Sequence, residues 1–239
     1  MTQYRLGVLG GMGPQATNTF YQFVIDRTDA RTDQEHVDAL ILSDSGMPDR
    51  TAAILGSEAE RQAVYRRLLA DARLLEGAGC TCIAVPCNTS HFFLDQVQEQ
   101  IGIPIIHMIR ETARLLASRG LKRPGILATD GTIRTELYQK EFFAAGIEAA
   151  TPSRPAQELV MSLIYDDIKA GRDGDPQKFA AVHQDLLAQG CDCGVLACTE
   201  LSVFADKHHL PHFYTDAMAV LAERSVQACR KPLRDIFVK

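Results

Sequence analysis

Two cysteines follow matching segments of this chain and are the residues best suited to proton-transfer chemistry. Four residues separate Cys82 from Cys87, four separate Cys193 from Cys198, and the second pair follows the first at a constant offset of 111 residues. Each pair brackets a short apolar run that ends at the second cysteine, as at the exposed end of a buried strand. If the two halves of the chain face each other, Cys87 and Cys198 flank one cleft. Proton transfer on both faces of a single carbon requires such a pair of opposed acid and base groups.

Burial in a core is the alternative role for any one of these thiols, because free cysteine is among the most buried residue types. The matched position of Cys87 and Cys198 at a helix start favours catalysis for this pair, since a helix N-terminus favours the thiolate. Core filling is expected for the cysteines at the strand beginnings, which are Cys80, Cys82, Cys191 and Cys193. A zinc site built from the two C-x-C pairs is a weaker alternative, because two separate sheets would hold the pairs apart.

The elements that would position these residues alternate between strands and helices. Strands are expected over 4–10, 39–43, 82–86, 103–106, 125–128, 194–198 and 212–214, and helices over 14–29, 57–77, 90–100, 132–145, 155–170, 176–189 and within 215–239. This rhythm predicts an α/β fold of parallel sheets flanked by helices. The repeat predicts two domains, residues 1–113 with 215–239 around Cys87 and residues 114–214 around Cys198.

Ligands of open parallel sheets bind beyond the carboxyl ends of the strands, so the predicted strand ends mark the candidate site. Most residues there are small or hydroxylic, which leaves backbone N–H groups and helix N-termini free to hold an anion. The strand-end segments are Gly10–Gly13, which contains Met12, then Ser43–Arg50, Cys87–Thr89, Thr129–Thr132, Cys198–Glu200 and Thr215–Asp216.

Composition narrows the classes of partner. The chain has 239 residues, is 46% hydrophobic and carries a net charge of −5, with no block of Lys or Arg. This pattern gives no electrostatic footprint for nucleic acid or an anionic membrane, so a small molecule is the expected partner. No apolar stretch approaches the roughly 18 residues of a membrane span, and no signal peptide is recognisable. We expect a cytoplasmic protein whose seven cysteines are reduced thiols.

Several other motifs have alternative interpretations. Gly11, Gly13 and Ala16 loosely fit the dinucleotide fingerprint, but Pro14 occupies the turn, and a glycine loop that admits a small substrate explains the pattern equally well. From pattern alone, Arg50 is a solvated loop charge and Lys169 a favourable cation at a helix C-terminus. For Glu200 and His91, a capping or packing role is the alternative to a functional one.

Five motifs spread over nearly the whole chain carry a family resemblance: Gly10–Pro14, Pro48–Thr51, Pro86–His91, Leu127–Thr132 and Ala197–Glu200. They resemble the aspartate racemase branch of the cofactor-independent aspartate/glutamate racemase superfamily. The resemblance implies two pseudo-symmetric α/β domains with the active site at the cleft between them. It also implies no pyridoxal phosphate or other cofactor, no metal, and a homodimer that acts on a small acidic amino acid.

The same resemblance assigns roles to residues of this chain. Cys198 would take the α-proton from the L-isomer and Cys87 from the D-isomer, one of them held as thiolate and the other as thiol. Arg50 and Lys169 match the positions that bind the side-chain carboxylate of the substrate. The remaining candidate substrate-binding residues are Met12, Asn88, Thr89, Thr129, Thr132, Thr199 and Glu200. Glu200 stands beside Cys198 and could tune that thiol.

Racemisation of aspartate is the function expected first. Glutamate racemases carry Asp-Ser after the first strand and Cys-Thr-His after the second cysteine, whereas this chain has Gly10-Gly11 and Cys198-Thr199-Glu200. A single methylene discriminates weakly, so a broader aspartate/glutamate racemase stays open. A related isomerase or lyase acting on another small diacid or a hydantoin is a further alternative. A non-enzymatic binding module for acidic metabolites and a dinucleotide-binding protein are the others.

Overall fold

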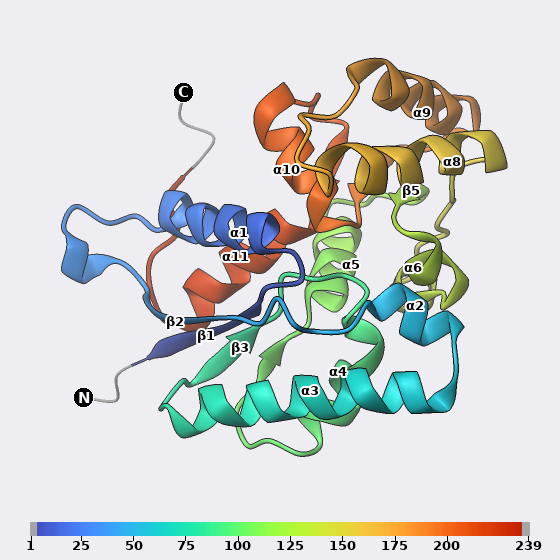
Figure 1. Cartoon of the computed structure of the whole chain (residues 1–239). Coiled ribbons are helices and arrows are strands. Elements are labelled where there is room, and N and C mark those ends of the chain that lie inside the picture. Colours follow the sequence, from blue (N-terminus) through green and yellow to red (C-terminus); the bar gives the residue numbers. More distant parts are fainter. Residues whose placement is uncertain (1–3, 236–239) are drawn as a thin grey trace. The chain divides into compact units, whose positions relative to one another are not determined.

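Parallel strands alternate with helices throughout the part of the chain that the computed structural model describes, residues 4–235. The chain forms two units. Unit 1 comprises the described residues of Met1–Met108 and Ala219–Lys239, and unit 2 comprises Ile109–Met218. Each unit contains one parallel sheet flanked by helices (Figure 1), which confirms the predicted α/β class with two sheets.

Unit 1 is built on a four-stranded sheet with the order β2-β1-β3-β4. Its strands are β1 (Arg5–Gly10), β2 (Asp38–Ser43), β3 (Cys82–Ala84) and β4 (Ile105–Ile106), all parallel. Helices α1 (Pro14–Arg27) and α11 (Ala217–Ala228) lie on one side of the sheet, and α3 (Glu58–Gly77) and α4 (His91–Gln98) lie on the other (Figure 1). The short elements η1 (Asp33–Glu35) and α2 (Arg50–Leu55) flank β2 in the sequence.

The strand order of unit 1 reverses between β1 and β3, since the chain goes from β1 to β2 on one side and then returns to β3 on the other. In open parallel sheets, such a switch point leaves a crevice at the carboxyl ends of the two strands, where ligands bind. The loops that border it here are the glycine loop after β1 and the segment from Val85 to Ser90 after β3. The topology thus places Cys87 at the expected binding edge of its sheet.

Unit 2 contains a three-stranded parallel sheet with the order β5-β6-β7. Its strands are β5 (Pro124–Leu127), β6 (Cys193–Leu196) and β7 (Tyr214–Asp216). Its helices are α5 (Met108–Ser118), α6 (Asp130–Arg134), α7 (Leu137–Ala144), α8 (Arg154–Ser162), the π-helical turn η2 (Leu163–Ile168), α9 (Pro176–Ala188) and α10 (Thr199–His208). Because β6 is the middle strand, Cys198 follows the most enclosed strand of this sheet, whose four residues are all buried.

Several predicted elements differ from the observed ones. The helix expected over 132–145 is two helices, because Glu136 adopts a left-handed conformation with φ of 55°. The helix expected over 155–170 changes to a π-helical turn at Leu163. The last strand begins at Tyr214 and not at 212, because the Tyr214 N–H donates to Pro211 O in a preceding turn. Thr215 and Asp216 therefore belong to β7 and not to a strand-end loop, and helices α2 and α5 were not predicted.

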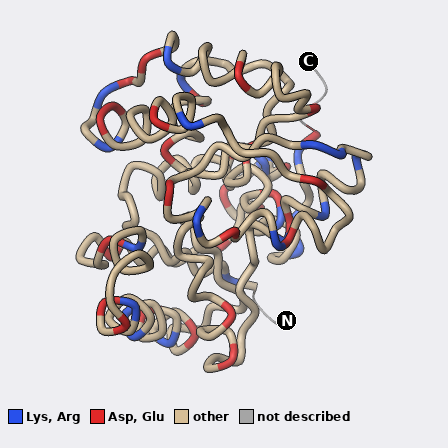
Figure 2. Tube along the Cα trace, turned by 90° about the vertical axis from the view of Figure 1, so that its right-hand side faces the viewer, with Lys and Arg blue, Asp and Glu red and all other residues tan. Residues whose placement is uncertain are grey.

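Charge and hydropathy are distributed as expected from the sequence. Blue and red segments are interspersed along the chain in Figure 2, so neither unit gathers a block of one sign. In the described part of the chain, every helix is too short or too polar to span a membrane.

Candidate active site

Cys87 follows β3 and is held by a buried histidine at the start of α4. Cys87 is 5% exposed and His91 is 3% exposed. His91 Nε2 accepts the Met108 N–H at 3.1 Å, so its Nδ1 carries the hydrogen that is donated to Cys87 O at 2.9 Å. This pair of hydrogen bonds fixes the backbone on which Cys87 is presented. Both contacts agree with the capping or packing interpretation of His91.

Asn88 and Thr89 occupy the two positions after Cys87 and are both buried, at 3% and 7% exposure. Ser90, the N-cap of α4, donates its hydroxyl to Met12 Sδ at 3.3 Å. The loops after β1 and β3 therefore touch, as expected of two loops at a switch point. Backbone N–H groups at the start of α4 lie on the same edge of the sheet.

Arg50 is tied to the glycine loop and is not the freely solvated charge that pattern alone suggests. Its Nη2 donates to Met12 O and its Nη1 to Pro48 O, each at 3.1 Å. The guanidinium thus joins the loop after β2 to the loop after β1. Gly11 has φ of +87°, and a Cβ there would overlap the backbone of Asp44, so only glycine fits this close approach.

Thr17 closes the glycine loop from the first turns of α1, a role that sequence reasoning missed. Its Oγ1 accepts the Gly11 N–H at 2.9 Å and donates to Gly13 O at 3.0 Å. The residue is 4% exposed. The only sequence signal is a hydroxyl four residues after Gly13, where a side chain on the first turns of a helix can reach back.

Cys198 is the N-cap of α10 and donates its thiol to Glu200. The distance from Sγ to Glu200 Oε2 is 2.9 Å, and Thr199 Oγ1 lies 3.4 Å from the same oxygen. Cys198 and Glu200 are each 6% exposed. One carboxyl oxygen of Glu200, Oε2, is therefore hydrogen-bonded to the Cys198 thiol and the Thr199 hydroxyl. The other oxygen, Oε1, faces Lys169.

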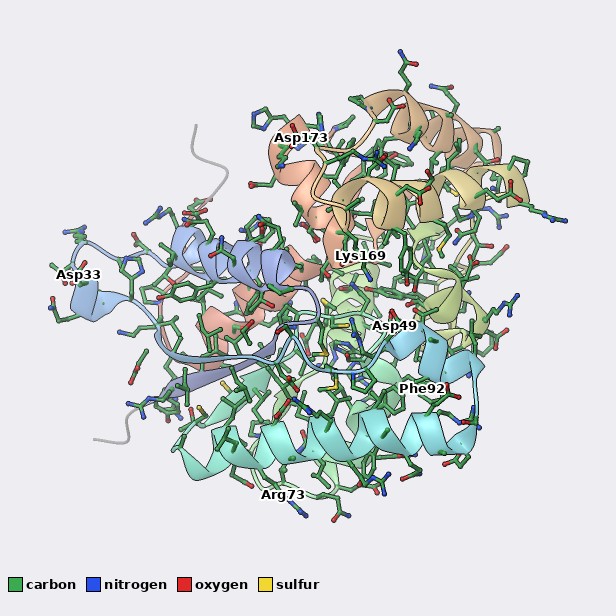
Figure 3. The ribbon with its side chains drawn as sticks, viewed as in Figure 1. Asp33, Asp49, Arg73, Phe92, Lys169 and Asp173 are labelled. Carbon is green, nitrogen blue, oxygen red and sulfur yellow. The ribbon has the colours of Figure 1, made fainter. Side chains whose placement is uncertain are left out.

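Lys169 caps the π-helical turn and approaches Glu200 Oε1 with its Nζ at 3.9 Å (labelled in Figure 3). The same Nζ lies 4.4 Å from the centre of the Tyr165 ring. A cation over an aromatic face is attracted to it, so the ring orients the ammonium. Tyr165 was not predicted as a site residue, although its position four residues before Lys169 on a helical segment was a usable signal.

Burial raises the pKa of the Cys198 thiol well above its ordinary value, the negative charge of Glu200 raises it further, and Lys169 acts in the opposite direction. The helix N-terminus, which favours the thiolate, therefore does not decide the protonation of this thiol. Loss of hydration and a neighbouring carboxylate outweigh the helix dipole here. Cys198 carries its proton at neutral pH.

Thr129 and Thr132 lie at the carboxyl end of β5, the strand next to β6. Thr129 is the N-cap of α6, and its Oγ1 accepts the Thr132 N–H at 3.4 Å and lies 3.2 Å from Thr132 Oγ1. Both hydroxyls are buried. Since parallel strands end at one edge of the sheet, these hydroxyls share the edge of unit 2 with Cys198.

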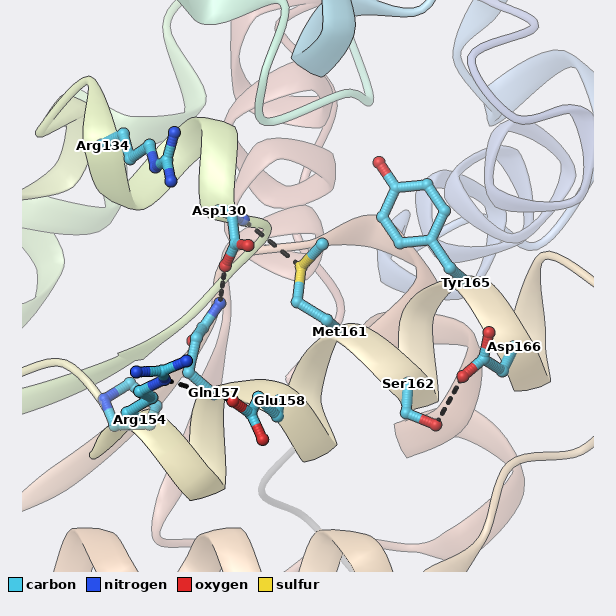
Figure 4. A pocket seen from close by; sticks show the side chains of 10 residues that line it. Asp130, Arg134, Arg154, Gln157, Glu158, Met161, Ser162, Tyr165 and Asp166 are labelled. Atoms are coloured by element: carbon cyan, nitrogen blue, oxygen red, sulfur yellow. Dashed lines mark hydrogen bonds and ion pairs between the residues drawn. The ribbon is translucent and has the colours of Figure 1, made fainter. Parts of the chain in front are cut away.

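A cavity of about 790 Å³ adjoins this edge of unit 2. Its lining includes Asp130, which follows Thr129, and Tyr165, which contacts Lys169. Figure 4 shows Gln157 Nε2 donating to Asp130 Oδ1, at 2.9 Å, and the Asp130 N–H directed at Met161 Sδ, at 3.3 Å. The exposed guanidinium of Arg134 contributes a positive charge to the lining.

The cysteines at the strand beginnings fill the cores. Cys80, Cys82, Cys191 and Cys193 are all buried, and the two C-x-C pairs belong to different sheets. Over residues 4–235, no group of three or more His, Cys, Asp or Glu side chains is arranged to hold a metal ion. The zinc interpretation therefore has no ligand set within that range.

The sequence and the fold of this chain are similar to those of known racemases. The sequence model of the Asp/Glu/hydantoin racemase family matches residues 9–224. A broad-specificity amino-acid racemase of Bacillus subtilis is 27% identical over 225 residues, which cover 92% of this chain and 96% of that protein. A glutamate racemase of Picosynechococcus is 33% identical over 129 residues, which cover 52% of this chain and 44% of that enzyme. The solved structure of Picrophilus torridus aspartate racemase is similar over 97% of this chain and 96% of that chain, with 26% identity and a TM-score of 0.81.

Proposed function

Because the chain belongs to the Asp/Glu/hydantoin racemase family, we propose that it interconverts L- and D-aspartate without a cofactor, using Cys87 and Cys198 as two opposed acid/base groups. Membership in this family makes the protein an amino-acid racemase, an isomerase. The choice of aspartate and the roles of the two thiols are the proposed part.

The placement of the two cysteines is the observation that carries this proposal. Each one follows an inner strand of a parallel sheet, β3 in unit 1 and β6 in unit 2, and each precedes a helix. The carboxyl end of a parallel strand is where such sheets bind ligands and present catalytic groups. Two units that repeat this arrangement supply the two groups that inversion of one carbon requires.

In the proposed reaction, one sulfur removes the α-proton from one face of aspartate and the other thiol delivers a proton to the opposite face. The substrate loses one proton and gains one, and the two cysteines exchange their protonation. Negative charge develops on the α-carbon and its carboxylate. Hydrogen-bond donors around that carboxylate stabilise the charge, a role we assign to Asn88, Thr89, Thr129, Thr132 and Thr199.

The side-chain carboxylate of aspartate is assigned to Arg50 and Lys169. Arg50 lies at the carboxyl end of the unit 1 sheet, where its guanidinium donates to Met12 O. Lys169 lies in unit 2 beside Glu200, and its side chain is 30% exposed. A guanidinium binds a carboxylate through parallel bonds and an ammonium adds a point charge. The similarity to the Picrophilus torridus aspartate racemase supports this substrate.

A broader amino-acid racemase is the second candidate. The cavity beside Thr129 and Lys169 is favourable to it, because about 790 Å³ exceeds what aspartate alone requires and Arg134 offers a further cation. The Bacillus subtilis relative, which is named for broad specificity, supports the same alternative. Initial rates with glutamate and with longer acidic amino acids, set against aspartate, separate the two candidates. A clear preference for aspartate favours the narrow assignment.

Circular dichroism of L- or D-aspartate incubated with the purified protein, without added cofactor, tests the proposed function. We expect the signal to decay to zero from either enantiomer. Cys87→Ser and Cys198→Ser should each lower the rate by roughly 10²–10⁴-fold, the range for one general acid/base group. Cys80→Ser and Cys191→Ser are the matched controls, because they occupy equivalent positions of the repeat before the strands. Full activity in either Cys87→Ser or Cys198→Ser would refute the two-thiol assignment.

A homodimer and a cytoplasmic location complete the proposal. Light scattering of the purified protein tests whether it is a homodimer. A mass of 26.3 kDa, which is the mass of one chain, would contradict the homodimer. Fractionation of the source cells tests the second.

A further inference from the structure

Cys82 and Cys229 are two buried thiols of unit 1 that contact each other and take no part in the proposed reaction. Their side chains are hydrogen-bonded to each other, and each residue is 3% exposed. Cys82 is the first residue of β3, and Cys229 directly follows helix α11. The thiol pair therefore connects an inner strand of the sheet to the end of this helix.

The face of the sheet on which Cys82 lies explains this contact. Side chains alternate between the two faces of a strand, and the next residue, Ile83, packs in the core cluster that contains Leu68 and Leu75 of α3. Cys82 therefore points to the opposite face, which α1 and α11 cover (Figure 1). Cys80 belongs to the cluster on the α3 side. Of these two neighbouring cysteines, Cys82 is the one directed at α11.

The equivalent cysteine of unit 2 has a different partner. Cys193 occupies the position of Cys82 in the repeat, 111 residues later in the chain. Its Sγ lies 3.4 Å from the hydroxyl oxygen of Thr215 and 3.3 Å from Gly194 O. A hydroxyl and a carbonyl thus satisfy a buried thiol at this position, so packing alone does not require a second thiol beside Cys82.

The thiol pair also lies where the two chain segments of unit 1 meet. Unit 1 is formed by residues up to Met108 and from Ala219 onward, and unit 2 is inserted between these segments. Cys82 belongs to the first segment and Cys229 to the second. A bond between them would close a loop of the chain that contains all of unit 2, and would hold α11 on the sheet covalently.

From this geometry we propose that Cys82 and Cys229 are an oxidation site, at which a hydroperoxide converts the two thiols into a disulfide that joins the two segments of unit 1. The inference is independent of the proposed racemisation, because Cys87 and Cys198 take no part in it. Disulfides of proteins in reducing compartments are transient or redox-sensing when they occur, so a dithiol should reverse the bond.

The reaction balances with the hydroperoxide as oxidant. The hydrogen bond from Cys229 lowers the pKa of Cys82, and the same hydrogen bond, together with burial, raises the pKa of Cys229. Cys82 therefore ionises first, and its thiolate attacks the O–O bond of hydrogen peroxide, which gives a sulfenic acid and one water. The Cys229 sulfur then attacks the sulfenic sulfur, the S–S bond forms and a second water leaves. The two thiols lose two electrons and two protons, which reduce one hydrogen peroxide to two waters.

The end of α11 is the part that must move for this bond to form. The two sulfurs have to approach from hydrogen-bond contact to about 2.05 Å. Cys229 is followed by a turn in which Arg230 has φ of 55° and the Lys231 N–H donates to Val226 O at 3.1 Å. Helix ends open at a lower free-energy cost than inner strands, so opening of this turn admits the peroxide.

Peptide mapping of the oxidised protein tests the inference directly. The protein is treated with hydrogen peroxide, its remaining thiols are alkylated, and the denatured chain is digested with trypsin. Cys229 is then the single cysteine of peptide 225–230, and Cys82 lies in peptide 74–110 with two other cysteines. We expect the two peptides to be cross-linked, with fragment ions that assign the bond to Cys82, and we expect a dithiol to separate them. An alkylated Cys229 after oxidation, or a bond from Cys229 to any other cysteine, would overturn the inference.

Stability supplies a second readout. The oxidised protein should unfold about 4–16 °C above the reduced protein, the range for one disulfide in a chain of this size. Cys82→Ser and Cys229→Ser should each abolish this difference, and the mapping of the parent protein decides alone if neither variant folds. Cys80→Ser and Cys193→Ser are the matched controls and should keep it. Equal midpoints of the oxidised and reduced parent, or a difference that persists in Cys229→Ser, would contradict the inference. Neither readout requires racemase activity, so its failure is distinguishable from failure of the proposed function.

Discussion

Replacing Thr17 by valine should remove the hydrogen bonds that the side chain of residue 17 makes to the glycine loop of unit 1, while leaving the shape of that side chain almost unchanged. The Thr17 hydroxyl accepts the Gly11 N–H at 2.9 Å and donates to Gly13 O at 3.0 Å. Gly13 O keeps a second donor, the Thr17 N–H at 3.1 Å. Only the buried Gly11 N–H is left without a partner in Thr17→Val.

The loss of stability expected in Thr17→Val is that of one buried N–H group without a hydrogen-bond acceptor. Leaving such a group unsatisfied costs about 1–3 kcal/mol. In a protein of this size, 1 kcal/mol lowers the midpoint of thermal unfolding by roughly 2–4 °C, so we expect a fall of about 2–12 °C. Because Met12 in the same loop accepts the Arg50 guanidinium, kcat/KM for aspartate should fall as well.

Thr19→Val is the matched control on the same helix. Thr19 is 7% exposed, and its hydroxyl makes no hydrogen bond to any of residues 4–235. Thermal unfolding followed by circular dichroism compares the two variants under one set of conditions. A Thr17→Val midpoint that matches that of Thr19→Val would refute the assignment of Thr17 as the residue that closes the loop.

The remaining predictions concern a carboxyl pair, a glycine in an inner strand and the substrate carboxylate. Burial and the charge of Asp44 raise the pKa of Asp71 to about 6, so its contribution to folding is present at low pH and is lost as the pH rises from about 3.9 through 6. Urea unfolding should therefore show Asp71→Asn gaining stability relative to the wild type across that window, and a pH-independent difference would contradict the pKa shift. Gly194→Ala should destabilise the protein by about 1–3 kcal/mol, because the new methyl would overlap the Tyr214 ring; an unchanged urea midpoint would disprove the overlap. Arg50→Lys should lower kcat/KM for aspartate by roughly 10–100-fold, since one charge-assisted hydrogen bond is worth about 1.5–3 kcal/mol, and wild-type kinetics would remove Arg50 from substrate binding.

Sequence predicts this fold well where a local pattern coincides with a packing requirement. The apolar runs before Cys87 and Cys198 contain buried strands followed by helices, as predicted, although these strands end at Ala84 and Leu196 and not at 86 and 198. The predicted bounds of helices and strands are wrong where they depend on a conformation or a contact that no local pattern in the sequence indicates. A left-handed Glu136 divides one predicted helix, and a turn at Pro211 shifts the start of β7. The π-helical turn before Lys169 has no signature in the sequence.

The same limit applies to the candidate site. Sequence spacing identified Cys198 and Glu200 as neighbours but could not show that the thiol donates to the carboxyl group at 2.9 Å. It also could not predict which protonation state Cys198 adopts, because a helix N-terminus is visible in the sequence and the loss of hydration is not. The hydrogen bond from Arg50 to Met12 O could not be predicted either, because it joins two loops whose residues lie 38 positions apart in the chain.

The position of solvent deuterium early in the reaction tests the two-sided transfer most directly. L-Aspartate is incubated with the protein in deuterium oxide and analysed by proton magnetic resonance before much of it has reacted. If Cys198 removes the proton from one face and Cys87 delivers a deuteron to the other, the D-aspartate formed carries α-deuterium and the remaining L-aspartate keeps its α-proton. Deuterium entering the unreacted L-aspartate as fast as D-aspartate forms would contradict a mechanism with one thiol on each face.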